Sequence, residues 1–138
     1  MASFSSQSQD RLDSCHTDLI VLFETVVKNF DCSVICGFRP EADQMDAYLT
    51  GNSQTKWPDS RHNTLPSMAV DVAPYPVDCN DRERFTLFAG YVLGVAATLR
   101  THGVISHGVR WGGDWNSNSH VSDNNFDDLV HFELRSSS

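Results

Sequence analysis

The apolar residues at the start of the chain recur with the spacing of a helix. They stand three or four positions apart, at Leu12, Cys15, Leu19, Leu22, Phe23, Val26, Val27 and Phe30. This spacing puts them on one face of an amphipathic helix, so we expect a single core-packed helix here. The β-branched run CSVICG at 32–37 then predicts a strand. A shorter helical pattern through Met45, Tyr48 and Leu49 ends near Gly51.

A polar loop and an alternating strand follow. Residues 51–67 are rich in Gly, Asn, Ser, Pro and Asp, which favours an ordered loop with little regular structure. In the next segment, MAVDVAPYP, Val70 and Val72 share one face of a strand while Asp71 lies on the other. The pattern therefore directs Asp71 away from the aliphatic face.

Two more elements complete the predicted pattern. Apolar positions over 85–99 indicate a long helix, with a capping-box pattern at 80–83 before it and Gly103 at its end. The final strand, VHFEL, puts His131 and Glu133 on the face opposite its aliphatic and aromatic residues. The last strand thus also presents polar side chains on one face.

Composition and charge narrow the class of protein. A chain of 138 residues with 40% hydrophobic residues suits one domain over 1–138, with flexible ends at 1–10 and 135–138. The net charge of −8 works against nucleic acid or an anionic membrane as a partner. The four cysteines favour reduced thiols, and neither a secretory signal nor a membrane span is apparent. We therefore expect synthesis in the cytoplasm.

Three residues could form a metal site. A catalytic zinc ion takes three protein ligands and keeps a fourth position for water. His62 lies in the loop before a strand, Asp71 points off that strand, and His131 points off the last strand. Each alone has an ordinary explanation, as a surface histidine or a strand-edge acid. However, Asp71 and His131 stand in apolar strands, where an unpaired polar group is costly, and a shared metal would satisfy both.

Short motifs then connect these residues to a known family. They are Ser60-Arg61-His62, Ala69-Val70-Asp71 and Asp128-Leu129-Val130-His131, supported by Gly37-Phe38-Arg39 with Gln44, Ala73-Pro74-Tyr75 and Gly112-Gly113-Asp114-Trp115. Together they resemble the S-x-H…A-x-D…D/E-x-x-H pattern of the D-Ala-D-Ala carboxypeptidase and L-alanyl-D-glutamate endopeptidase family of zinc enzymes, which includes phage endolysins. The resemblance covers about residues 34–134. One departure is the spacing from His62 to Asp71, nine positions instead of the family's seven, which we interpret as a loop insertion.

The resemblance implies a fold and roles for single residues. The fold is α+β, with helices on a small, mainly antiparallel sheet whose exposed face carries one zinc ion, the D-Ala-D-Ala carboxypeptidase or hedgehog-like fold. His62, Asp71 and His131 would be the metal ligands and Asp128 the catalytic acid and base, although its neighbour Asp127 stays open for that role. The resemblance also places Arg39 at the oxyanion or a substrate carboxylate and Ser60 in substrate binding. Separately, Glu133 shares the strand face of His131 and would orient a ligand.

The function implied is that of a zinc-dependent peptidoglycan endopeptidase. Its partner would be the stem peptide, cut between L-Ala and D-Glu by a monomeric, phage-type endolysin that reaches the wall through a membrane pore. Two alternatives are a D,D-carboxypeptidase or dipeptidase acting on D-Ala-D-Ala ends and a non-catalytic zinc-binding module.

Some other residues carry weaker signals. Asp114, Asn116 and Asn118, with Asp123, repeat like the first ligands of a calcium loop, but Ser119 and Asn125 replace its glycine and glutamate, so Ca²⁺ is only weakly supported. The histidines without a motif, His16, His102, His107 and His120, are not expected to be ligands. Cys32 and Cys36 alternate onto one strand face and are expected in the core.

Overall fold

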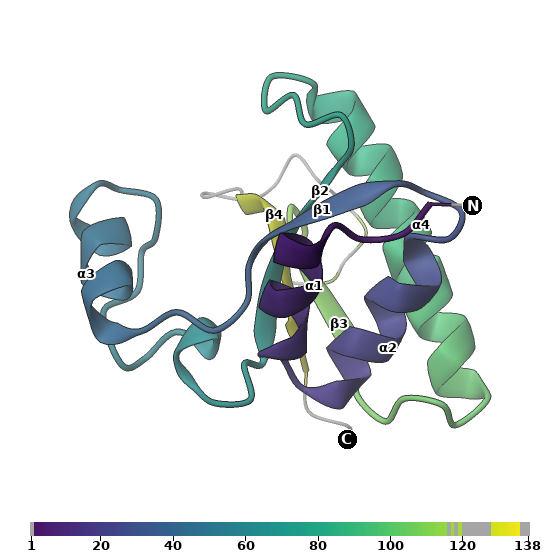
Figure 1. Ribbon diagram of the computed structural model, residues 1–138, viewed down its shortest axis with the longest axis horizontal. Helices are drawn as coiled ribbons and strands as arrows, with labels where there is room; N and C mark the ends of the chain where they lie inside the picture. Colours follow the sequence, from purple (N-terminus) through teal and green to yellow (C-terminus); the bar gives the residue numbers. More distant parts are fainter. Residues whose placement is uncertain (1, 116, 118, 120–127, 136–138) are drawn as a thin grey trace.

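Residues 2–115, 117, 119 and 128–135 are described by a computed structural model of the protein (Figure 1). Within them the helices are α1 (Ser6–Asp13), α2 (Thr17–Val26), α3 (Glu41–Leu49), the 3-10 helix η1 (Arg61–Asn63) and α4 (Arg82–Thr101). The strands are β1 (Cys32–Cys36), β2 (Ala69–Pro74), β3 (Val109–Gly112) and β4 (Asp128–Leu134). The predicted α+β class is confirmed. None of the described helices is long and apolar enough to cross a bilayer.

The four described strands form one antiparallel sheet in the order β1-β2-β4-β3. Strands β2 and β4 are neighbours in the middle of the sheet. Asp71 pairs directly with His131, and Ala69 pairs with Glu133. Because residues directly opposite each other project to the same face, these polar side chains gather on one side of the sheet.

The hydrophobic core lies on the other side, under α2 and α4, which run beside each other in Figure 1. Phe132 of β4 is its centre. The Phe132 ring meets Phe23 of α2 at 5.4 Å and Phe88 of α4 at 6.1 Å between centroids, both in edge-on geometry. Such aromatic contacts add to the burial of apolar area. The alternation of residues along β4 thus places Phe132 in the core and its neighbours His131 and Glu133 on the opposite face, in the site.

The first helix differs from the sequence expectation. Instead of one helix there are two, α1 and α2, separated at 14–16. The chain leaves the helix because Cys15 forms a β-bridge with Ser67, and His16 restarts it by accepting a hydrogen bond from the Asp18 amide at 2.9 Å. Helix α1 also covers residues 6–10, where we expected a flexible end.

Two other helices differ in detail. The cap of α4 is Asp81, which accepts from the Arg84 amide at 3.1 Å, so the capping box expected from Asn80 is wrong. The end of α4 is as predicted, with Gly103 at a φ of 74° after the helix. The predicted short helix is α3, but Leu49 of its apolar pattern is 77% exposed, and the one buried residue is Gln44.

A polar cluster joins the start of α2 to the segment before β3. The carboxylate of Asp18 accepts hydrogen bonds from the His107 ring at 2.8 Å, the Ser106 amide at 3.1 Å and the His107 amide at 3.2 Å. Burial raises the pKa of Asp18, but the hydrogen bonds from His107 and Ser106 outweigh it and leave the pKa below its usual value. The cluster also includes His16, whose ring lies 5.0 Å from that of His107.

The Asp18 cluster predicts a stability that depends on pH. A carboxylate with a depressed folded-state pKa stabilises the fold above its unfolded pKa, and this contribution disappears as pH falls through the folded pKa. We expect Asp18→Asn to lower the free energy of unfolding at pH 7 by about 1–3 kcal/mol, since hydrogen bonds to a charged acceptor are lost. Urea denaturation at pH 7 and pH 3 measures the difference, with exposed Asp10→Asn as control. An equal loss at both pH values would contradict this account.

Candidate active site and metal centre

His62 is held by a backbone contact behind its ring. Its Nδ1 lies 2.7 Å from the Gly37 carbonyl oxygen, which accepts the ring proton and leaves Nε2 facing β2. A side chain on Gly37 would collide with the Arg11 carbonyl and the Ser14 hydroxyl, so glycine is required there. Ser60 caps η1 by accepting from the His62 amide at 3.2 Å. The loop thus fixes both the position and the tautomer of His62.

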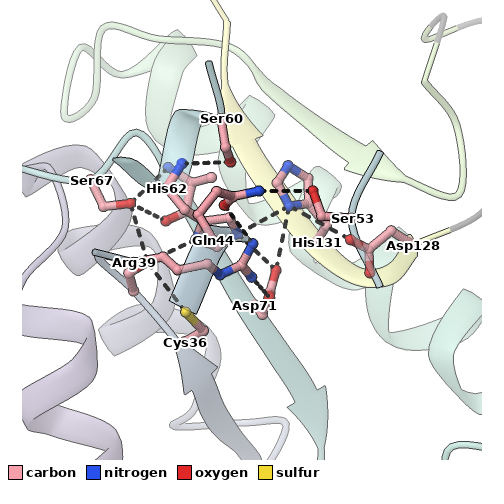
Figure 2. A network of polar contacts seen from close by, with 12 residues as sticks. Cys36, Arg39, Gln44, Ser53, Ser60, His62, Ser67, Asp71, Asp128 and His131 are labelled. Atoms are coloured by element: carbon pink, nitrogen blue, oxygen red, sulfur yellow. Dashed lines mark hydrogen bonds and ion pairs between the residues drawn. The ribbon is translucent and has the colours of Figure 1, made fainter. Parts of the chain in front are cut away.

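The donor atoms of His62, Asp71 and His131, which come from three separate segments, face one another (Figure 2). His62 Nε2 lies 3.1 Å from Asp71 Oδ1 and 3.3 Å from His131 Nδ1, and His131 Nδ1 lies 3.4 Å from Asp71 Oδ1. A tetrahedral zinc ion with bonds of roughly 2.0–2.1 Å sets its ligand atoms about 3.3 Å apart. Two imidazoles and one carboxylate are also ligands that zinc accepts. The donor set therefore fits a zinc ion with a fourth position for water.

These side chains are more enclosed than the sequence suggested. We expected an exposed sheet face, but His62 is 1% exposed, and Asp71 and His131 are 7% exposed. The reason is that η1 packs against β2, while Arg61 reaches across to Glu133 at 3.1 Å. The loop that carries His62 therefore also covers part of the site.

The buried charges shift one another's pKa values. Burial lowers the pKa of His62, but the charge of Asp71 and its hydrogen bond outweigh this and raise the pKa to about 10. For His131, burial is likewise outweighed by hydrogen bonds to Asp71 and Glu133, and the pKa is raised. Burial raises the pKa of Asp71, but the charge of His62 and contacts with His131 hold it well below its usual range. In the metal-free protein, a protonated imidazole thus balances the carboxylate.

Asp128 stands at the start of β4, beside this triangle. Its Oδ2 lies 4.0 Å from His131 Nδ1. A side chain on Gly112 would collide with the Asp128 backbone, so the glycine opposite lets this strand end approach closely. Burial, and then the charge of Asp71, raise the pKa of Asp128 to about 6. Its neighbour Asp127, the alternative for the same role, lies outside the described residues.

Arg39 contacts a candidate ligand. Its Nη2 donates to Asp71 Oδ2 at 3.2 Å and its Nη1 donates to Gln44 Oε1 at 3.0 Å. The guanidinium is therefore within the site but is directed at a carboxylate of the protein itself. Ser60 likewise has a local contact, as the cap of His62 described above.

Glu133 lies behind His131 on the same strand face. Its Oε1 accepts from His131 Nε2 at 2.8 Å, which fixes the tautomer with Nδ1 directed at Asp71. Two arginines bind its other oxygen, Arg110 at 2.5 Å and Arg61 at 3.1 Å. Burial raises the pKa of Glu133, but the hydrogen bonds from His131 and Arg110 lower it to about 2.

Several neighbours were not predicted as site residues: Arg61, Arg110, Asn63, Gln44, Trp115 and Cys36. Trp115 packs its ring 5.3 Å from that of His131, and no periodic pattern indicates this.

The prediction that Cys36 lies in the core is wrong, because a bulge between Val34 and Cys36 puts Cys36 opposite Asp71. It is half-buried, and its sulfur lies within 4.8 Å of donor atoms of His62 and Asp71. All four cysteines are free, as expected.

The calcium prediction is not tested by the structure. Asp114 accepts from the Ser119 amide at 2.9 Å. The other proposed ligands, Asn116, Asn118 and Asp123, lie outside the described residues, as do Asn125 and His120.

The two imidazoles and two carboxylates, which come from η1, β2 and β4, form the kind of site that a metal-dependent hydrolase needs. The chain belongs to the phage L-alanyl-D-glutamate peptidase family, whose match covers residues 1–135. It is similar to the crystal structure of the Serratia marcescens L-Ala D-Glu endopeptidase ChiX, with 28% identity, a TM-score of 0.69, and coverage of 97% of this chain and 91% of that one. No curated protein matches the chain. Zinc dependence is general in the family.

Because the pKa of His62 is raised, we expect a metal ion and a proton to compete for its Nε2 atom. At pH 7 the ring is protonated in the metal-free protein, so a metal ion can bind only after that proton leaves. We expect zinc binding to release at least one proton and the apparent affinity to rise about tenfold or more per pH unit between pH 6 and pH 8. Calorimetry in buffers of different ionisation enthalpy measures the release. A binding heat that is the same in every buffer would contradict it.

Proposed function

We propose that the protein cuts the L-alanyl–D-glutamate bond of peptidoglycan with one zinc ion held by His62 Nε2, Asp71 Oδ1 and His131 Nδ1. The observation that carries this proposal is the triangle of donor atoms, with sides of 3.1, 3.3 and 3.4 Å. When bound, zinc would polarise the scissile carbonyl and lower the pKa of a water molecule from about 15.7 towards 7. All other steps depend on the side chains around it.

Asp128 is proposed as the group that moves the proton. It would accept a proton from the attacking water and deliver it to the departing D-glutamate amine. Its side chain is 27% exposed, compared with 9% for those of Asp71 and His131, so it is the carboxylate that a substrate can reach. A pKa of about 6 in the metal-free protein is also nearer to neutral than that of an ordinary aspartate, which suits both directions of transfer.

Arg39 is proposed to stabilise negative charge on the substrate. The contacts with Asp71 and Gln44 engage two of the five N–H donors of its guanidinium. The others can serve the oxyanion or the free carboxylate of D-glutamate, while the contact with Asp71 keeps the group at the site. Ser60 is proposed as a substrate contact, because it lies directly before η1, which carries His62.

Glu133 is proposed to orient His131. A metal-bound histidine usually donates its second ring proton to an acceptor, and Glu133 accepts that proton at 2.8 Å. Arg110 and Arg61 offset the buried charge of Glu133. The carboxylate therefore stays ionised and keeps His131 Nδ1 directed at the proposed metal position.

The scissile bond and the ligands are tested together. Digestion of purified sacculi by zinc-loaded protein should give fragments with a new D-glutamate amine, detected by mass spectrometry, whereas release of D-alanine would indicate the D,D-carboxypeptidase alternative.

We expect His62→Ala, Asp71→Ala and His131→Ala each to lose the bound zinc and at least 100-fold in rate. His102→Ala, at the exposed end of α4, is the control and should keep both.

Metal analysis of the same proteins should give one zinc per chain. A folded His131→Ala variant that kept one tightly bound zinc and its activity would disprove the ligand set. A second ion that persists in all three variants would instead indicate binding at His16, Asp18 and His107, whose donor atoms also lie within 4.8 Å of one another.

The role of Asp128 is tested by Asp128→Asn. We expect a rate loss of about 10²–10⁴-fold with zinc content unchanged, because the amide cannot accept the proton but keeps the size of the side chain. Stem-peptide hydrolysis followed by chromatography measures the rate, and exposed Asp43→Asn in α3 serves as control. Near-normal hydrolysis by the folded, zinc-loaded variant would remove Asp128 from this role and leave Asp127 as the candidate.

A further inference from the structure

Helix α3 stands apart from the sheet and from the other helices (Figure 1). No other described element packs extensively against it. Its single buried residue is Gln44, which is completely buried, although apolar residues such as Leu49 are available on the helix. The apolar residues Met45, Ala47 and Tyr48 are only partly buried, so polar contacts contribute strongly to the position of the helix. The amide of Gln44 is therefore the one fully buried anchor of α3.

The amide of Gln44 uses all of its hydrogen-bonding capacity. Its Nε2 donates to the Thr55 carbonyl at 2.6 Å and to Ser53 Oγ at 3.0 Å, both in the loop after α3. Its Oε1 accepts from Arg39 Nη1 at 3.0 Å and from Asn63 Nδ2 at 3.1 Å. Figure 2 shows Gln44 between Ser53 and Arg39. The donor half of the amide thus faces the loop and the acceptor half faces the site.

Arg39 links Gln44 to Asp71, one of the proposed metal ligands. Arg39 donates to Gln44 with one nitrogen and to Asp71 with the other. An arginine side chain has many rotamers, and two acceptors at fixed positions select one of them. Asp71 is fixed by its strand, so the second fixed point for the guanidinium is Gln44.

We propose that Gln44 is a positioning residue, which sets the guanidinium of Arg39 for the reaction and ties the loop at 53–55 to the same point. This inference rests on the role proposed above for Arg39. It assigns no substrate contact to Gln44 itself, because both donors and both acceptor positions of its amide are occupied by other protein groups.

A double-mutant cycle separates positioning from simple support of the fold. The variants are Gln44→Met, which keeps the size but loses all four contacts, Arg39→Ala and the double variant. Ser53→Ala is the matched control, since it removes one contact of Gln44 and the local contacts with Thr55 but leaves the Arg39 side of the amide intact. The measurements are kcat and KM on a soluble stem peptide, zinc content and the melting temperature.

We expect Gln44→Met to lose at least tenfold in kcat/KM with zinc content unchanged, and to divide the loss between kcat and KM as Arg39→Ala does. The double variant should be no slower than Arg39→Ala within about twofold, because the effect of Gln44 passes through Arg39. Ser53→Ala should lose less than threefold. Independent, multiplying losses would overturn the inference, as would full activity of Gln44→Met.

A second variant keeps the test valid if Gln44→Met fails to fold. Gln44→Glu keeps both acceptor contacts and loses both donor contacts, so we expect kcat/KM within about threefold of the parent but faster trypsin cleavage after Lys56. A loss as large as that of Arg39→Ala would overturn the inference. Full activity of Arg39→Ala itself would instead disprove the role proposed for Arg39, which is a different failure.

Discussion

The structure depends on one constraint, the burial of the Asp71 carboxylate on the central strand of the sheet. An isolated buried carboxylate is costly, so it needs a positive partner close by. The pairing of β2 with β4 places His131 opposite it, and the loop at 61–63 brings His62 to its other side. In the metal-free protein a proton on His62 supplies the positive charge. The same position suits a divalent cation, so the fold holds the ligands in place before any metal arrives.

The need to balance charge extends outward from Asp71. Behind His131, Glu133 carries a negative charge that Arg110 and Arg61 offset. On the other side, Arg39 meets the second oxygen of Asp71 and is in turn fixed by Gln44. Although the protein carries a net charge of −8, three of its arginines lie around this site. Alternating charges of this kind keep each group ionised and limit the orientations that it can adopt.

The sequence predicts the elements whose pattern is local. The period of two in β2 and β4 separates Asp71 and His131 from the core, and the structure agrees. Prediction from the sequence fails where a contact with a residue far away in the chain determines the path of the backbone. The break at 14–16 arises from pairing with Ser67, and the position of Cys36 opposite Asp71 arises from a bulge in β1 against β2. Gln44 appears in the family pattern, but its burial cannot be predicted from periodicity, because its partners come from three other segments.

The unusual spacing between His62 and Asp71 shows why the site tolerates a change in the loop. Ser67 anchors the loop, since its amide donates to the Ser14 carbonyl and its hydroxyl donates to the Ala69 carbonyl at 2.6 Å. The residues at 64–66, between His62 and this anchor, are all exposed. Two additional residues can therefore extend outward without moving either ligand, because loop length itself costs little free energy. On the interpretation that the longer spacing is a loop insertion, the added residues lie at the exposed rim, and His62 Nε2 remains 3.1 Å from Asp71 Oδ1.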